Sequence, residues 1–264
     1  MGKINQTQRA AIGWTVLTTV SQKQEFIRYN ELARQIGIHH RPLRYVLGLI
    51  QNYCLINHLP PLTILVVNQT GLPGEGFIAW DVDNIEEGLS QVYNYNWQNL
   101  ENPFGYAEKG FTEEEVINSL LNDPDSSNEI YSLIKVRGAA QPIFRKALLL
   151  AYENKCAFCD FTFPVALQAS HIVAWSKASK NERLDIRNGI LLCSTHHKLF
   201  DCGLFTINDD YLINYFDVEK EAGIYSHADE YLTLKIHNKK IRLPRNRKHW
   251  PRKDFLKRHR DAFA

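Results

Sequence analysis

Two pairs of cysteine and histidine side chains have the spacing of a zinc site. Cys156 and Cys159 are separated by two residues, and Cys193 and His196 have the same gap. A gap of two residues lets both side chains of a tight turn face one tetrahedral zinc ion. The sequence therefore predicts one closed, structural zinc site. Cys202 is a rival fourth ligand in place of His196, although it lies outside the two-residue gap.

Three more residues of the same stretch are suited to proton transfer or metal binding. His197 and Asp201 stand four residues apart on a segment that is predicted to be helical. Their side chains then project from one face of the helix, where they can hold a cation between them. His171 belongs to neither set of ligands, and an imidazole that is neutral near physiological pH can accept a proton.

The stretch from Cys156 to Asp201 resembles the HNH nuclease motif, which is carried on the ββα-metal fold. That motif has a first strand ending in a histidine, a loop with an asparagine and a helix that carries the last ligands. The resemblance places His171, Asn188 and His197 at the three named positions and Asp201 at an extra helix position. The surrounding segments, Ser-His-Ile-Val-Ala-Trp, Asn-Gly-Ile-Leu-Leu and Leu-Phe-Asp-Cys-Gly-Leu, are similar to the branch found in predicted restriction endonucleases.

The resemblance implies a metal-dependent DNA endonuclease. Hydrolysis of a phosphodiester needs an activated water, a cation near the scissile phosphate and a proton for the leaving group. His171 is expected to be the general base, and His197 and Asp201 are expected to hold one Mg²⁺ or Mn²⁺ ion. Ser170 stands where many members of the family have Asp or His as a metal ligand, which leaves the cation with fewer protein ligands. Asn188 either anchors the loop or fills that gap as a ligand.

Composition indicates a soluble, cytoplasmic protein. The 264 residues are 44% hydrophobic, enough to bury one large or two modest cores, and no apolar run is long enough to span a bilayer. The first residues lack the basic region, apolar core and cleavage site of a signal peptide. Four of the five cysteines cluster around the motif, which in a reducing compartment indicates metal binding rather than disulfides.

Charge is distributed unevenly along the chain. Residues 235–260 contain twelve Lys or Arg and a single acid, whereas residues 81–130 contain twelve acids and a single base. The basic segment also contains Trp250 and Phe255, as expected for a surface that meets phosphates. The alternative is a solvated basic tail. The residues predicted to contact DNA phosphates are Arg245, Arg247, Lys248, Arg252 and Lys253.

The N-terminal region is predicted to contain a helix-turn-helix. A first helix is expected over 6–21, a short second helix runs from near Asn30 to Gly37, and a third starts around Pro42. Arg41 and Arg44 would then face outward and read a DNA groove, although many helix pairs joined through glycine only form a core. Strands are predicted at 59–67 and 77–80, and such a hairpin after a helix pair suggests a winged helix.

The remaining patterns complete an α+β fold. Helices are predicted at 83–102, 112–122, 139–155 and from 251 onward, strands at 204–207 and 211–214, and a hairpin at 231–243. The acidic segment 122–128 is the best linker, with a boundary near 126. Residues 1–126 are thus expected to be a DNA-binding helix-turn-helix or winged-helix domain. Residues 127–264 are expected to be a zinc-stabilised ββα-metal (HNH) nuclease domain with a basic C-terminal segment.

The expected substrate is double-stranded DNA, and the expected role is restriction or related anti-phage defence. A homing or phage-type HNH nuclease is a rival within the same class of enzyme. A DNA-binding regulator whose zinc fold has lost catalysis is a rival from another class, and Ser170 is the feature in its favour. One active site per chain implies a homodimer for concerted cutting of both strands.

Overall fold

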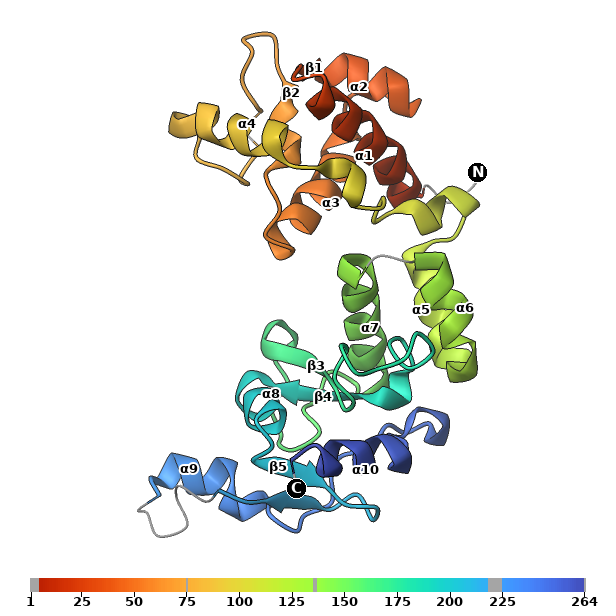
Figure 1. Ribbon diagram of the computed structural model, residues 1–264, viewed down its shortest axis with the longest axis vertical. Coiled ribbons are helices and arrows are strands. Elements are labelled where there is room, and N and C mark those ends of the chain that lie inside the picture. Colours follow the sequence, from red (N-terminus) through yellow and green to blue (C-terminus); the bar gives the residue numbers. More distant parts are fainter. Residues whose placement is uncertain (1–4, 75, 135–136, 218–224, 264) are drawn as a thin grey trace. The chain divides into compact units, whose positions relative to one another are not determined.

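The computed structural model describes residues 5–74, 76–134, 137–217 and 225–263. They form two compact units that alternate along the chain (Figure 1). The N-terminal unit consists of residues 1–115 and 133–140, and the C-terminal unit consists of residues 116–132 and 141–264. The domain boundary near residue 126 stays a prediction.

The N-terminal unit is mainly helical. Its elements are α1 (Gln6–Gln22), β1 (Ile27–Arg28), α2 (Tyr29–Ile36), α3 (Leu43–Ile56), β2 (Val66–Val67) and α4 (Ile85–Asn94). Trp14 of α1 makes edge-to-face contacts with Tyr53 and Trp97, at 5.4 and 5.6 Å between ring centroids. Gly13 lets α1 approach α3, because a Cβ there would meet Ile50 at 3.3 Å. An aromatic core therefore holds these helices together.

The predicted helix pair forms as expected. α2 ends at Ile36, and Gly37 adopts a left-handed φ of +76°, which glycine reaches without steric cost. α3 begins at Leu43, directly after Pro42. Arg41 and Arg44 are exposed on this segment. Two consecutive helices are thus present, whereas a DNA-binding helix-turn-helix stays a prediction.

The predicted hairpin after the helix pair does not form in the described residues. Leu62–Leu65 are a 3-10 helix, and only Val66–Val67 are a strand, which pairs in parallel with β1. The strand expected at 77–80 is wrong, and the winged-helix arrangement is not confirmed. The run 62–67 is buried throughout, so its sequence has no alternation that would distinguish a strand from a helical turn.

The helix predicted over 83–102 is shorter than expected. α4 ends at Asn94, and Trp97–Asn99 form a separate 3-10 turn. Trp97 is 3% exposed, and its indole nitrogen donates a hydrogen bond to the Val92 carbonyl at 2.9 Å. The chain leaves the helix so that this large side chain can enter the core.

The C-terminal unit contains the ββα arrangement that the motif predicts (Figure 1). Strands β3 (Leu167–His171) and β4 (Gly189–Cys193) are antiparallel, with His171 opposite Gly189. Helix α8 (Ser194–Asp201) follows β4 without an intervening loop. The other elements of the chain are α5 (Glu113–Asn122), α6 (Ser127–Ile134), α7 (Arg137–Ala151), β5 (Phe205–Ile207), β6 (Ile213–Tyr215), α9 (His227–Leu232) and α10 (Lys253–Asp261).

Gly189 allows α7 to support the end of the strand pair. A Cβ at this position would lie 2.6 Å from both Phe144 and Leu148 of α7, closer than carbon atoms can approach. Phe144 and Leu148 are fully buried. The glycine after Asn188 therefore lets α7 lie against the strand end that carries His171.

The acidic segment 122–128, which the sequence predicts to be a linker, is folded. It forms a 3-10 turn, Pro124–Ser126, and the start of α6. The Ser127 hydroxyl donates a hydrogen bond to the Asn181 carbonyl at 2.6 Å, and Asp125 pairs with Arg187 at 2.6 Å. These contacts tie the segment to the loop that precedes β4.

Downstream of the motif, one of the four predicted elements is wrong. The strands expected at 204–207 and 211–214 are present as β5 and β6, but the hairpin expected at 231–243 is replaced by α9 and a 3-10 turn, Leu234–Ile236. Reciprocal hydrogen bonds between Ser226 and Asp229 start α9. The last helix is confirmed as α10. Among the described residues, no helix has the length and apolar composition of a membrane span.

Candidate active site and metal centre

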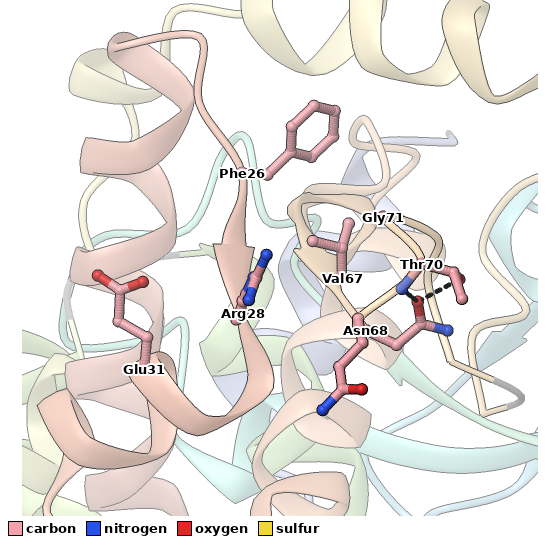
Figure 2. A pocket seen from close by; sticks show the side chains of 8 residues that line it. Phe26, Arg28, Glu31, Val67, Asn68, Thr70 and Gly71 are labelled. Carbon is pink, nitrogen blue, oxygen red and sulfur yellow. Dashed lines mark hydrogen bonds between the residues drawn. The ribbon is translucent and has the colours of Figure 1, made fainter.

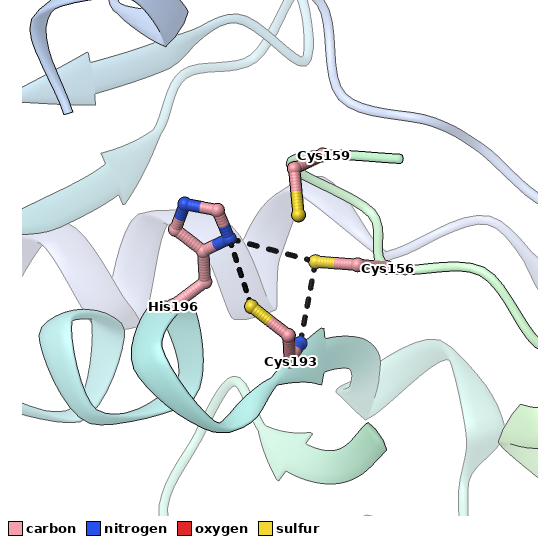
Figure 3. A group of neighbouring side chains, drawn as sticks. All are labelled: Cys156, Cys159, Cys193 and His196. Carbon is pink, nitrogen blue, oxygen red and sulfur yellow. Dashed lines mark hydrogen bonds between the residues drawn. The ribbon is translucent and has the colours of Figure 1, made fainter. Parts of the chain in front are cut away.

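The four predicted zinc ligands lie together at the start of α8 (Figure 3). The ligand atoms of Cys156, Cys159, Cys193 and His196 all lie within 4.8 Å of one another. His196 Nδ1 is 3.2 Å from the Cys193 sulfur and 3.6 Å from the Cys156 sulfur. Tetrahedral zinc with ordinary bond lengths separates sulfur and nitrogen ligands by about 3.5 Å. The spacing therefore fits a zinc ion.

Hydrogen bonds orient these ligands. His196 Nε2 lies 3.0 Å from the Leu232 carbonyl, which can only accept, so Nε2 carries the proton and Nδ1 is left to bind a metal. The Cys193 amide donates to the Cys156 sulfur at 3.3 Å. The C-terminal segment that forms α9 thus fixes the histidine ligand.

The electrostatics of the cluster also suit a cation. Hydrogen bonds from Cys156 and Cys159 hold the pKa of Cys193 far below its ordinary value. Burial would lower the pKa of His196, but its hydrogen bonds with Cys156 and Cys193 raise it to about 10. Without a metal the cluster therefore holds a thiolate beside an imidazolium, and a bound zinc ion would displace the proton from Nδ1 of His196. Cys202, the rival ligand, is exposed and lies outside this group.

His171 lies at the end of β3 with its ring held on two sides. Its Nε2 is 2.9 Å from the Arg183 carbonyl, so Nε2 donates this hydrogen bond. The ring stacks on Phe144 with centroids 4.2 Å apart and planes 14° apart. Trp175 meets it edge to face at 5.4 Å. These contacts fix the direction of the imidazole.

His197 and Asp201 form a pair on one face of α8. His197 Nε2 is 3.4 Å from an Asp201 carboxylate oxygen, and the two side chains are 25% and 49% exposed. The Ser170 hydroxyl donates a hydrogen bond to the other carboxylate oxygen at 3.3 Å, from a fully buried position. Ser170 therefore ties the end of β3, next to His171, to the last turn of α8.

Asn188 is fully buried, and among the described residues its side chain bonds to the backbone of neighbouring loops. Its side-chain oxygen accepts a hydrogen bond from the Val173 amide at 2.8 Å. Its side-chain nitrogen donates to the Val173 and Glu182 carbonyls at 3.3 and 3.1 Å. The amide holds the loop after His171 against the segment that contains Arg183.

Comparison with known families agrees with this geometry. A model of the HNH endonuclease family matches residues 156–208. These residues belong to the HNH endonuclease family. The match includes every predicted zinc ligand and all four residues of the HNH pattern, so the chain contains a nuclease domain whose substrate is nucleic acid. No curated protein matches the chain.

The HNH domain depends on an arginine that sequence reasoning missed. The Arg242 guanidinium donates hydrogen bonds to the carbonyls of Cys156 and Cys159, at 2.5 and 2.8 Å, and to the Asp160 carboxylate at 2.7 Å. It closes the loop that holds the first two zinc ligands. No local pattern marks this role, because Arg242 is more than 80 residues away from that loop.

The five basic residues predicted to meet phosphates are all exposed but differ in their surroundings. Arg252 forms two hydrogen bonds to Asp254, and Arg245 pairs with Glu153 at 2.6 Å. Arg247 lies over the Trp250 ring at 5.5 Å. Lys248 and Lys253 are also exposed. Intramolecular acids thus partly neutralise the surface beside the HNH domain.

Proposed function

We propose that this protein is a metal-dependent endonuclease that cuts double-stranded DNA, with a role in restriction or anti-phage defence. The observation that carries the proposal is the position of His171. Its ring is fixed by Arg183 and Phe144. The neighbouring residue, Ser170, is hydrogen bonded to the carboxylate of the His197–Asp201 pair. A proton acceptor and two metal-ligand side chains therefore lie at one end of the ββα motif.

In this proposal His171 is the general base. The Arg183 carbonyl keeps the proton on Nε2, so Nδ1 accepts the proton of the attacking water. Stacking on Phe144 keeps Nδ1 directed at that water. The ring then delivers the proton to solvent. The hydrogen bond from Nε2 to the uncharged Arg183 carbonyl can persist in both the neutral and the protonated form of the ring.

His197 and Asp201 supply one nitrogen and one or two oxygens to a divalent cation such as Mg²⁺ or Mn²⁺. When bound, this ion supplies charge stabilisation at the scissile phosphate and the leaving oxygen. Only the zinc cluster gathers three or more Cys, His, Asp or Glu ligands among the described residues. Two protein ligands leave the remaining positions of such an ion for water and phosphate. Ser170 positions Asp201 rather than replacing a missing ligand.

Asn188 anchors the loop in this proposal and does not bind metal. All its side-chain hydrogen bonds go to backbone groups, and it is fully buried. By holding the Glu182 carbonyl, it fixes the chain just before Arg183, whose carbonyl orients His171. The structural zinc ion would hold the start of α8 and hence the direction of His197.

DNA would meet two surfaces of different kinds. Arg41 and Arg44, exposed beside and on α3, would read a groove, whereas the basic C-terminal segment would meet phosphates. The restriction role rests on the likeness of the HNH segments to the branch found in predicted restriction endonucleases. Concerted cutting of both strands would require a homodimer, because each chain has one such site.

The test is cleavage of supercoiled plasmid by the zinc-loaded full chain, with and without added Mg²⁺ or Mn²⁺. Cation-dependent nicked or linear product is expected, and Asp201→Ala should require a higher cation concentration. Binding without cleavage at any cation concentration would favour the regulator that has lost catalysis. Phage DNA with and without modified bases should be cut differently by a restriction enzyme. Equal cutting of both at one long site would favour a homing nuclease.

A further inference from the structure

A cavity of about 270 Å³ lies in the N-terminal unit beside α3 and the glycine-rich segment around Gly74. Its volume is just below that of pockets for drug-sized ligands, which begin at about 300 Å³. The side chains that line it are Tyr29, Arg44, Leu47, Gln51, Thr63 and Phe77. Two aromatic rings, an aliphatic side chain and two uncharged polar groups thus surround a space for a small ligand.

Gly48 borders this space. It lies inside α3 on the cavity wall, and a Cβ added there would meet no atom within 4 Å. Glycine inside a helix costs roughly 0.5–1 kcal/mol relative to alanine. At Gly13 and Gly189 a larger residue would crowd neighbouring side chains, which explains the glycines there. No described residue would crowd a side chain at position 48 in this way. A ligand that occupies the space beside α3 would supply a reason for the glycine.

Gln51 is a buried polar side chain of the lining. Its side chain is 7% exposed, its oxygen accepts from the Ile78 amide at 3.2 Å, and its nitrogen donates to the Gly76 carbonyl at 3.4 Å. These bonds fix the amide but leave a second hydrogen on nitrogen and a second lone pair on oxygen. Adjacent donor and acceptor groups of this kind match the edge of a nucleobase.

Thr63 adds a second polar group to the wall. It is 4% exposed, and its hydroxyl has no hydrogen-bond partner among the described residues. A buried hydroxyl without a partner costs about 1–3 kcal/mol. Among the described residues of the lining, the one charged side chain, Arg44, is exposed, so this part of the wall suits an uncharged ring.

A larger cavity of about 440 Å³ in the same unit makes a weaker site (Figure 2). Its Asn68 oxygen already accepts hydrogen bonds from the amide and hydroxyl of Thr70. Its Phe26 ring is 49% exposed. The polar groups there stabilise their own turn, and they do not converge on one ligand.

We infer that the cavity beside Gly48 receives a single nucleobase, turned out of the duplex that the HNH domain cuts. Enzymes hold such bases by hydrogen bonds to the base edge and by stacking between aromatic or apolar side chains. Gln51, Tyr29 and Phe77 provide these groups. Arg44 on the same helix also lines the cavity and contacts the exposed ring of Tyr45, so its proposed groove contact would lie next to this base. The inference rests on the proposed DNA endonuclease function for the source of the base.

The test compares binding to duplexes that differ only at one central base pair, matched or mismatched. The full chain carries His171→Ala so that the DNA stays intact, and dissociation constants come from fluorescence anisotropy. Removing a base from a matched pair costs a few kcal/mol, so the mismatched duplex should bind about tenfold more tightly or better. Because cleavage is not measured, failure of the endonuclease proposal on plasmid DNA is a separate result.

Variants of the cavity decide whether it causes this preference. Gly48→Leu fills the space, and Phe77→Ala removes a stacking ring without filling it. Both should lose the preference while keeping the affinity for matched DNA within about twofold, since base stacking contributes about 1–3 kcal/mol. Asn52→Leu, an exposed position of α3 that does not line the cavity, should keep the preference. Thermal unfolding confirms that each variant folds.

Two results would overturn the inference. The first is equal binding of matched and mismatched duplexes, or a preference that survives in both Gly48→Leu and Phe77→Ala. The second comes from titration with the four free deoxynucleosides. In that case the protein would bind one nucleoside saturably, Gly48→Leu would abolish this binding, and matched and mismatched duplexes would bind equally. This result would assign the cavity to a free nucleoside instead of DNA.

Discussion

Replacing Arg242 with Ala should loosen the zinc loop of the HNH domain. The guanidinium donates to the carbonyls of Cys156 and Cys159 and to Asp160. The backbone amide of residue 242 also donates to the Ala157 carbonyl, at 2.8 Å, and Ala would keep that bond. The substitution therefore removes the side-chain contacts and leaves the chain path in place.

The expected loss follows from these contacts. A hydrogen bond from a charged donor contributes about 1.5–3 kcal/mol. The pair with Asp160 adds at most about 1 kcal/mol, because the Asp160 side chain is 92% exposed. Arg242 is itself 35% exposed, so water can reach the carbonyls that the substitution leaves without a donor. Each lost hydrogen bond should therefore cost about 1.5 kcal/mol, the lower end of that range. The free energy of unfolding should fall by about 3 kcal/mol, and zinc affinity by about 10–100-fold.

Denaturant unfolding and transfer of zinc to a coloured chelator measure these two effects. Arg245→Ala is the matched control, because Arg245 is 86% exposed and makes a surface pair with Glu153, for which a loss below about 1 kcal/mol is expected. If Arg242→Ala and Arg245→Ala unfolded at the same denaturant concentration and released zinc equally readily, the reasoning about the loop would be refuted.

Three further predictions concern the metal centre, the loop and a buried histidine. Cys156→Ser should abolish the one zinc per chain and unfold the C-terminal unit, as read by metal analysis and circular dichroism; a folded, active, zinc-free variant would contradict the structural role. Asn188→Ala should slow cleavage and destabilise the protein by about 2–4 kcal/mol. The Mn²⁺ concentration that gives half-maximal cleavage should not change. A higher Mn²⁺ requirement would instead make Asn188 a ligand. Burial lowers the pKa of His259 from 6.5 to about 4. As the pH falls, the unfolded chain therefore protonates this side chain at a higher pH than the folded protein does. About 3 kcal/mol of stability that is present above pH 6.5 should be lost as the pH falls toward 4. His259→Phe should flatten this dependence in urea unfolding from pH 4 to 7, and equal slopes would count against it.

The ββα motif follows from the resemblance to the HNH family, whereas local spacing predicts the two ligand pairs of the zinc cluster. Cys156 with Cys159, and Cys193 with His196, are two residues apart, so their geometry depends on single turns. The α2–α3 pair was predictable for the same reason, since Gly37 ends one helix and Pro42 precedes the next. Each of these features is encoded within a few residues.

Features that depend on distant partners could not be predicted. The buried run 62–67 and the segment 231–243 have strand-like composition, yet tertiary packing makes them mostly helical turns. Basic residues looked alike in sequence, but Arg242 binds the zinc loop and Arg258 pairs with Glu182, 76 positions away. The cavity beside Gly48 is likewise lined by residues from separate segments.

Single-turnover cleavage of plasmid DNA by His171→Ala tests the central claim most directly. Loss of a general base should lower the rate about 10²–10⁴-fold, while DNA affinity stays within about twofold of that of the unchanged protein. His227→Ala, at an exposed histidine of α9, is the matched control and should cut at the ordinary rate. Cleavage by His171→Ala at a rate near that of His227→Ala would contradict the assignment of His171 and, with it, the proposed mechanism.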